Sequence, residues 1–146
     1  MELTSEDMDD GGRMPEVFTC DGLNTSPRLD IEDVPGGAGS LALVMNDLDA
    51  GEAPFYHWIV VGIPPSVGTM RRGWRGEEGQ VMRNDFGVAG YVGPCFPDGH
   101  HRYRFTLYAL DWRPRGHQVS VEELDFLLRH RVLGRCSLTV SYGGDR

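Results

Sequence analysis

Five polar side chains with acid–base or ligand-binding chemistry lie where apolar runs of the sequence begin or end: Asp47, Asp49, His57, His101 and Tyr103. Charge is costly to bury without a partner, so such side chains beside buried segments predict a shared polar pocket. Two histidines and one carboxylate are also the ligand set of some iron sites, and a His–Asp pair can act as a general base. A binding pocket, a metal site and a hydrolytic site are the three alternatives.

Each of these side chains also has a purely structural interpretation. Asp49 can brace its own loop through an Asx turn, and His57 can be a strand histidine whose hydrogen bonds are satisfied within the fold. No Ser or Cys stands in a nucleophile motif such as G-x-S-x-G, so we expect no enzymatic activity. Residue chemistry alone leaves the choice between a pocket and packing open.

The segments that carry these residues are predicted to be strands. "SLALVMND" and "HWIVVGIP" are short, continuously apolar runs that end in turn residues. In "HRYRFTLYALD" alternate residues share one face, so His101 and Tyr103 point the same way. The closing run "RCSLTVSY" alternates in the same manner, whereas the Gly-rich region from Gly62 to Gly99 is predicted to be mostly loop.

One segment near the C-terminus, residues 120–133, is predicted to be a helix. Ser120 and Glu123 fit a capping box, and Gly134 is expected to end the helix. An apolar stripe would pack on the rest of the fold: Leu124, Leu127, Leu128 and Val132. Several strands and one late helix indicate a mainly β protein, a two-sheet β-sandwich with one or two short helices.

Composition restricts the domain organisation and the partners. A chain of 146 residues forms one domain, which we place at residues 14–146 after a frayed segment at residues 1–13. The 20 Gly and 9 Pro favour a turn-rich fold. With 22 acidic against 14 basic residues the net charge is −8, which disfavours binding to nucleic acid and stable association with an anionic membrane.

The cysteines and the N-terminus indicate a reducing compartment. Cys20, Cys95 and Cys136 form an odd set without metal-site spacing, which predicts three free thiols and no disulfide. The first residues, "MELTSEDMDDGGRMP", are acidic and lack an apolar core, so they match neither a signal peptide nor a membrane span. A cytoplasmic location is the prediction.

Five runs along the chain resemble the prokaryotic branch of the phosphatidylethanolamine-binding protein family, also called Raf kinase inhibitor-like proteins. The runs are "FTCDGLNTSPRL", "VPGGAGSLALVMNDLDA", "YHWIVVGIP", "NDFGVAGYVGPCFPDGHHRYRFTLYALD" and "VLGRCSLTVSY", in unbroken order over roughly residues 15 to 143. The resemblance implies two antiparallel sheets with Greek-key connections. It also implies a small surface pocket for phosphate-like anions and phosphorylated headgroups.

The resemblance assigns site residues by position in its motifs. The ligand-binding set is Asp47, His57, Cys95, Phe96, Pro97, His101 and Tyr103. The supporting set is Asp49, Trp58, Gly93, Pro94 and Arg102. In this interpretation the imidazoles and the phenol donate to the anion, and Asp47 orients a histidine and favours its protonated form. Binding is then stronger near pH 6 than near pH 8, through His57 or His101.

Three residues depart from the family pattern. Leu48 and Phe96 stand where proline is usual, and His100 adds an imidazole. Leu48 is expected to free a backbone N–H and loosen the turn between the aspartates. The predicted function is a binding protein for small anionic or phosphorylated ligands, with no cofactor and no metal. Regulation of a partner kinase or protease and assembly as a homodimer are left open.

Overall fold

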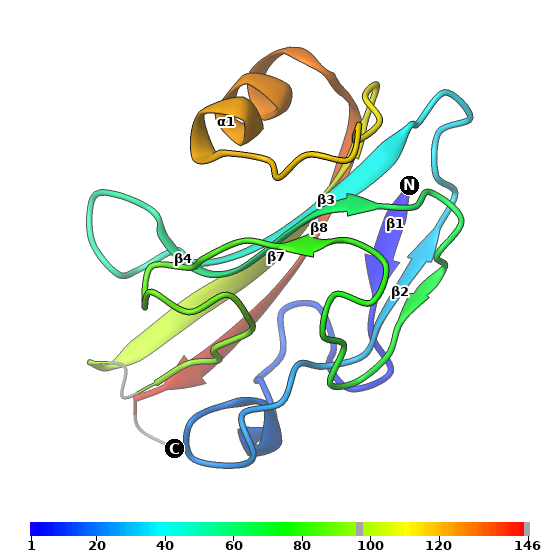
Figure 1. The fold of residues 1–146 in the computed structure, drawn as a ribbon. Helices are drawn as coiled ribbons and strands as arrows, with labels where there is room; N and C mark the ends of the chain where they lie inside the picture. Colours follow the sequence, from blue (N-terminus) through cyan, green and yellow to red (C-terminus); the bar gives the residue numbers. More distant parts are fainter. Residues whose placement is uncertain (96–97, 145–146) are drawn as a thin grey trace.

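The computed structural model describes residues 1–95 and 98–144. They form a mainly β fold of two antiparallel sheets (Figure 1). One sheet has the order β1-β2-β5, with strands β1 (Glu2–Thr4), β2 (Leu29–Glu32) and β5 (Thr69–Met70). The other has the order β6-β4-β3-β7-β8, with strands β6 (Gln80–Val81), β4 (Phe55–Ile63), β3 (Ser40–Asp47), β7 (His100–Leu110) and β8 (Val132–Gly143). A short 3₁₀ turn, η1 (Glu16–Phe18), and the helix α1 (Val121–His130) complete it. The predicted two-sheet sandwich is confirmed.

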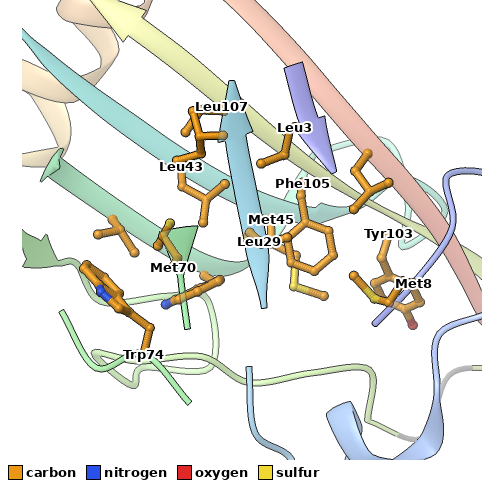
Figure 2. Packing of buried hydrophobic residues seen from close by; sticks show 14 of the residues in the cluster. Leu3, Met8, Leu29, Leu43, Met45, Met70, Trp74, Tyr103, Phe105 and Leu107 are labelled. Atoms are coloured by element: carbon orange, nitrogen blue, oxygen red, sulfur yellow. The ribbon is translucent and has the colours of Figure 1, made fainter. Parts of the chain in front are cut away.

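The main core fills the space between the two sheets. Leu29 and Met70 of the small sheet are fully buried, and they belong to the same cluster as Leu43 and Phe105 of the large one. Figure 2 shows these side chains converging from both sheets. The alternation predicted for the third strand is confirmed, because Tyr103, Phe105 and the residues that follow at every second position on β7 are buried in this cluster.

The outer face of the large sheet is covered as well. Val44 and Val61 on this face share a second cluster with Leu124 and Leu127 of α1, and the helix lies across the sheet in Figure 1. Both faces of β3 are therefore buried, which explains why its sequence is continuously apolar instead of alternating.

The N-terminal segment differs from the predicted frayed end. Leu3 pairs with Ile31 in the small sheet, and Leu3 and Met8 are both buried. Backbone hydrogen bonds from Gly11 to β8 hold the rest of the segment. Leu3 and Met8 are isolated apolar residues among acidic ones, so the sequence shows too little periodicity to predict this strand.

The predicted helix is present, although Gly134 does not end it. The helix stops at His130, and β8 begins at Val132 and includes Gly134. Leu124 and Leu127 are buried as expected, and Leu128 is partly buried against the same cluster. The strand begins directly after the helix, because the Arg131 carbonyl accepts a hydrogen bond from the backbone of Asp111, the residue that follows β7.

Removal of the N-cap of α1 should destabilise the protein measurably. The Ser120 side chain accepts a hydrogen bond of 3.1 Å from the backbone N–H of Glu123. We expect Ser120→Ala to lower the free energy of unfolding by roughly 0.5–2 kcal/mol in urea denaturation. Ser66→Ala is the matched control, because exposed Ser66 makes no side-chain hydrogen bond within residues 1–95 and 98–144. Equal stabilities of the two variants would contradict the capping role.

Candidate functional site

The C-terminal end of β3 brings two other strands to the same point. Asp47, the last residue of β3, lies opposite Phe55 on β4 and opposite Tyr103 on β7. Residues paired directly across neighbouring strands share a face, so these three side chains meet on one side of the sheet. That side is also the one on which His101 lies, two residues before Tyr103.

A bulge in β4 brings His57 to this group. Met45 pairs with Trp58 and Asn46 pairs with Tyr56, so His57 is an extra residue between two regular pairs. An extra residue re-aims its side chain and bends its strand, and such bulges are frequent beside functional sites. The His57 ring consequently contacts Tyr103 edge-on, with 5.3 Å between the ring centroids.

His101 is held between two acceptors. Its Nδ1 lies 2.7 Å from Oδ2 of Asp47, and its Nε2 lies 3.0 Å from the backbone carbonyl oxygen of Asp98. A carboxylate and a carbonyl only accept, so both ring nitrogens carry protons when both bonds form. The hydrogen bond to Asp47 is the main cause that raises the pKa of His101. The geometry therefore favours an imidazolium, and the hydrogen bond from His101 to Asp47 is the contact that the predicted orienting role requires.

His57 is in the opposite state. Its Nδ1 lies 2.6 Å from the carbonyl oxygen of Val92 and donates to it. Burial lowers the pKa of His57, which is only 3% exposed, so its ring is neutral near pH 7. Nε2 of a neutral ring protonated on Nδ1 is an acceptor. His57 therefore cannot donate to an anion at neutral pH, which differs from the role expected from the sequence.

Aromatic side chains surround His57. Tyr103, Phe55 and Phe86 all contact its ring edge-on, with centroid distances of 5.3, 5.5 and 5.1 Å. Burial raises the pKa of the Tyr103 phenol, which therefore keeps its proton. The Tyr103 hydroxyl makes no hydrogen bond to any described residue, so its O–H is available as a donor.

Asp49 braces the loop rather than the histidines. It accepts hydrogen bonds from Nε and a terminal nitrogen of Arg102 at 3.0 and 2.9 Å, and from the Arg102 backbone N–H. The Arg102 side chain is the main cause that lowers the pKa of Asp49 to about 2. Leu48 does not loosen this turn, because its N–H donates to the Arg102 carbonyl oxygen at 2.8 Å. This hydrogen bond fixes the loop at a position where proline, which lacks an N–H, could not form it.

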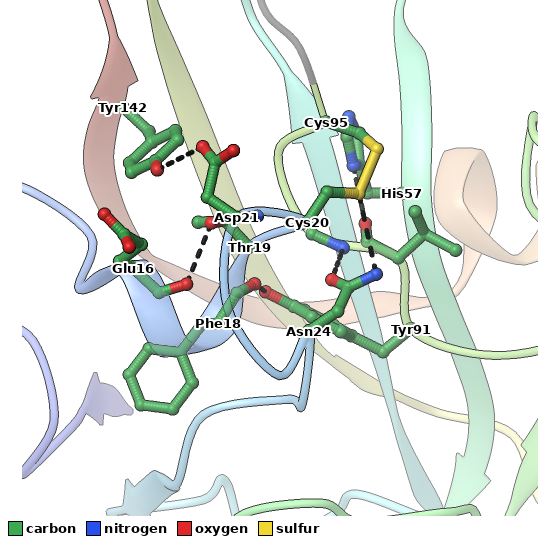
Figure 3. Close-up of a disulfide and its surroundings, with 12 residues drawn as sticks. Glu16, Phe18, Thr19, Cys20, Asp21, Asn24, His57, Tyr91, Cys95 and Tyr142 are labelled. Carbon is green, nitrogen blue, oxygen red and sulfur yellow. Dashed lines mark hydrogen bonds between the residues drawn. A yellow bond between two sulfur atoms is a disulfide. The ribbon is translucent and has the colours of Figure 1, made fainter.

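The prediction of three free thiols is wrong. Cys20 and Cys95 form a disulfide across 75 residues of sequence, and only Cys136 of the described cysteines is free (Figure 3). The same connection is reinforced by the backbone, since Cys20 N–H donates to the Pro94 carbonyl oxygen at 3.0 Å. Cys95 therefore anchors the Gly-Pro loop instead of offering a thiol to a ligand.

Gly93 lets two segments approach closely at this loop. Its N–H donates to Oδ1 of Asn24 at 2.8 Å. Asn24 lies beside the disulfide (Figure 3). A Cβ at this position would lie 2.0 Å from the Phe18 carbonyl oxygen, so a larger residue would separate the segments. Gly93 and Pro94, which were predicted to support the site, are both buried.

The remaining predicted residues fall outside this group or outside the described chain. Trp58 points into the core and packs edge-on against Tyr91 at 5.3 Å. Phe96 and Pro97 lie outside the described residues. Four contributors were not predicted: Phe55, Phe86, Val92 and Asp98. Two of these act through backbone carbonyl oxygens, for which side-chain chemistry gives no signal.

The geometry does not favour the metal alternative. No group of three or more His, Cys, Asp or Glu in residues 1–95 and 98–144 is arranged to hold a metal ion. Both nitrogens of His101 are engaged by acceptors, which leaves no lone pair directed at a cation. The two-His, one-Asp set is thus divided between a charged and a neutral imidazole.

The sequence matches known proteins over nearly its whole length. The family model described as phosphatidylethanolamine-binding protein matches residues 4–143. A UPF0098 protein of Methanothermobacter thermautotrophicus is 45% identical over 116 residues, covering 76% of this chain and 77% of that protein. A UPF0098 protein of Aquifex aeolicus is 34% identical, covering 99% and 90% of the two chains.

Solved structures agree with the sequence matches. The phosphatidylethanolamine-binding protein homologue CT736 of Chlamydia trachomatis superposes with a TM-score of 0.89 and 32% identity, covering 99% of this chain and 97% of that chain. Escherichia coli YbcL, described as a member of the mammalian family, superposes with a TM-score of 0.85 and 28% identity. The match covers 99% of this chain and 98% of that chain.

One relative bears on location. Mycobacterium tuberculosis LppC, named as a candidate lipoprotein, is 45% identical over 103 residues, and the match spans 51% of its length. In the part of this chain that the structure describes, no helix has the length and apolar character needed to cross a bilayer. With matches to one family model, several relatives and two solved folds, the chain belongs to the phosphatidylethanolamine-binding protein family.

Proposed function

We propose that this protein binds small phosphorylated or carboxylated ligands without catalysing a reaction on them. The observation that carries the proposal is the imidazolium of His101, fixed by Asp47 beside the Tyr103 hydroxyl, which makes no hydrogen bond to a described residue. A positive charge and a neutral donor at one place suit an anionic oxygen. The guanidinium of Arg102 does not compete for this role, because it is already paired with Asp49.

In the proposed complex, an oxygen of the ligand replaces the Asp98 carbonyl oxygen as the hydrogen-bond acceptor of His101. Nε2–H of His101 donates to the Asp98 carbonyl, which belongs to an exposed residue. An anion that replaces this carbonyl receives a charge-assisted hydrogen bond in place of a neutral one. Nε2 of His57 adds an acceptor, which suits the remaining P–OH of a singly protonated phosphate monoester. The affinity is expected to be modest, because a bidentate arginine is lacking among the described residues at the site.

The pH dependence of the proposed binding rests mainly on His101. Burial lowers the pKa of His57, so His57 carries less charge than an ordinary histidine in this range and contributes less to the change. Phosphate itself titrates in this range, which makes a phosphonate monoester with a single acidic group the better probe. Binding of that probe should be tighter at pH 6 than at pH 8 in calorimetric titrations.

Substitution of the two histidines separates their roles. We expect His101→Ala to weaken binding at pH 6 by about tenfold or more, because a hydrogen bond to a charged group contributes roughly 1.5–3 kcal/mol. His57→Ala should weaken binding less and leave the pH dependence intact. If wild-type affinity is equal at both pH values and unaffected by His101→Ala, the anion-binding proposal fails and only the family assignment stands.

The disulfide bears on the cellular location of the protein. The disulfide between Cys20 and Cys95 is typical of an oxidising compartment, which bears against the cytoplasmic location predicted from the N-terminus. The cytoplasmic location, the regulation of a kinase or protease, and the homodimer remain predictions. Measurement of the redox state of Cys20 and Cys95 in intact cells would test the first of them.

A further inference from the structure

One cavity of the structure lies apart from the Asp47–His101 pair. Its volume is about 340 Å³, within the usual size range of small-molecule sites. Three loops contribute to its wall, around Ser26, Trp74 and Tyr91, and β4 contributes Trp58. Of the residues predicted for the anion site, only Trp58 lines this cavity. We call it the tryptophan cavity.

An unsatisfied hydroxyl distinguishes the tryptophan cavity. Ser26 is 3% exposed, and its Oγ makes no hydrogen bond to any residue within 1–95 or 98–144. It is the one buried side-chain oxygen or nitrogen of the described residues in this condition. A buried polar group without a partner is costly, so an unmatched hydroxyl in a cavity wall indicates a missing partner from water or a ligand.

The apolar part of the wall is preformed and aromatic. Trp58 and Tyr91 meet edge-on with an interplanar angle of 89°, and Trp74 is 5% exposed. The Tyr91 hydroxyl donates to the Phe18 carbonyl oxygen at 2.7 Å, which fixes the ring (Figure 3). Figure 2 shows Trp74 at the edge of the main core. Rings held in this way favour a flat aromatic partner over water alone.

The cavity also has a cationic side chain at its wall. Arg75 lines the cavity and is exposed, and its guanidinium forms no ion pair with a described residue. The adjacent carboxylate of Glu77 instead accepts from the Arg75 backbone N–H at 3.0 Å and pairs with Arg71 at 3.8 Å. In a protein of net charge −8, an exposed guanidinium that forms no ion pair with a described residue and lies beside an aromatic cavity suits a carboxylate.

We propose that the tryptophan cavity binds a small aromatic carboxylate. The ring packs against Trp58, Trp74 and Tyr91, a polar group of the ring hydrogen-bonds to Ser26, and the carboxylate pairs with Arg75. This site is independent of the anion site at His101. It selects for an aromatic ring, whereas the anion site selects for the acidic group.

Indole-3-acetate is a suitable probe, because its ring N–H can donate to Ser26 and its carboxylate can reach Arg75. The protein would be labelled with fluorinated tryptophan, which gives one ¹⁹F resonance for each of its three tryptophans. We expect the probe to shift the Trp58 and Trp74 resonances. The Trp112 resonance should stay unchanged, because Trp112 lines a different cavity beside α1.

Variants identify the groups involved. Ser26→Ala and Arg75→Gln should each weaken the probe by about five- to tenfold. Arg115→Gln is the matched control, because Arg115 is also exposed, forms no ion pair with a described residue and lines the cavity beside α1. Ser26→Ala removes an unsatisfied group and should not lower the melting temperature. If it nevertheless fails to fold, Arg75→Gln changes only an exposed side chain and keeps the test available.

Four results would overturn the proposal. The first is an unchanged Trp74 resonance at millimolar probe. The second is an equal response to cyclohexaneacetate, which lacks the aromatic ring. The third is loss of the indole-3-acetate response in His101→Ala, which would place the carboxylate in the anion site. A crystal structure grown with the probe that shows only water at Ser26 would likewise overturn it.

Discussion

Loss of the disulfide between Cys20 and Cys95 should lower the free energy of unfolding by about 4 kcal/mol. The bond closes a loop of 75 residues, and a cross-link of this length removes much of the conformational freedom of the unfolded chain. The double variant Cys20→Ser/Cys95→Ser is the direct test. Urea denaturation of the oxidised wild type and of the double variant measures the difference.

The third cysteine supplies the control. Cys136 is free and partly buried on β8, so Cys136→Ser leaves the disulfide in place. Its stability should fall only slightly, and it should still respond to reductant. Thiol titration of denatured wild type should find one thiol before reduction and three afterwards. Three thiols before reduction, or a double variant as stable as the wild type, would contradict the disulfide and restore the earlier prediction of free thiols.

The four long strands were predictable because each carries a strong local pattern. β3 and β4 are continuously apolar runs, and β7 and β8 alternate with period two. Short elements gave no comparable signal. β1 has one buried residue, Leu3, and the prediction for this segment relied on its acidic composition. The end of α1 was misplaced because Gly134 fits a helix C-cap as well as it fits the start of a strand.

The site was predictable to the extent that it is made of side chains. Asp47, His101 and Tyr103 meet because alternation and strand pairing place them on one face. The state of each histidine was not predictable, since it depends on partners that are distant in sequence or lie in the backbone. Val92 is 35 residues from His57 and contributes only its carbonyl oxygen. The disulfide was missed because an odd cysteine count leaves the pairing undetermined.

Replacement of Asp47 by asparagine should weaken anion binding at neutral pH but not at low pH. The carboxylate raises the pKa of His101, so His101 keeps its charge to a higher pH than an ordinary histidine. In Asp47→Asn this support is lost, and His101 becomes neutral at a lower pH. Near pH 7 the variant should therefore bind the phosphonate monoester more weakly, because a smaller share of His101 carries the charge that strengthens the hydrogen bond.

At low pH the difference in affinity between Asp47→Asn and the wild type should disappear or change sign. Near pH 5.5 His101 is protonated in both proteins, and Asp47→Asn has lost a negative charge beside the anion. The variant should then bind the probe as tightly as the wild type or more tightly. A loss of affinity measured at only one pH would also be explained by local disorder in the variant. A crossing of the affinity-against-pH profiles of Asp47→Asn and the wild type requires the Asp47–His101 pair.

The same linkage acts on stability. A histidine with a raised pKa contributes stability that is fully present below its unfolded pKa, about 6.5, and is lost as the pH rises through the folded pKa. His57, with its lowered pKa, acts in the opposite direction and costs stability as the pH falls below about 6.5. Asp47→Asn should remove only the first contribution, so its melting temperature relative to the wild type should fall most at low pH.

Asp49→Asn is the matched control for the binding experiment. It removes a carboxylate from the same loop, but one whose main partner is Arg102 and not an imidazole. Its affinity profile for the phosphonate monoester should keep the wild-type pH dependence, because the principal support of the His101 charge is still present. If Asp49→Asn and Asp47→Asn shift the profile equally, the loop as a whole acts on the anion. The specific pairing of Asp47 with His101 would then not be the source of the pH dependence.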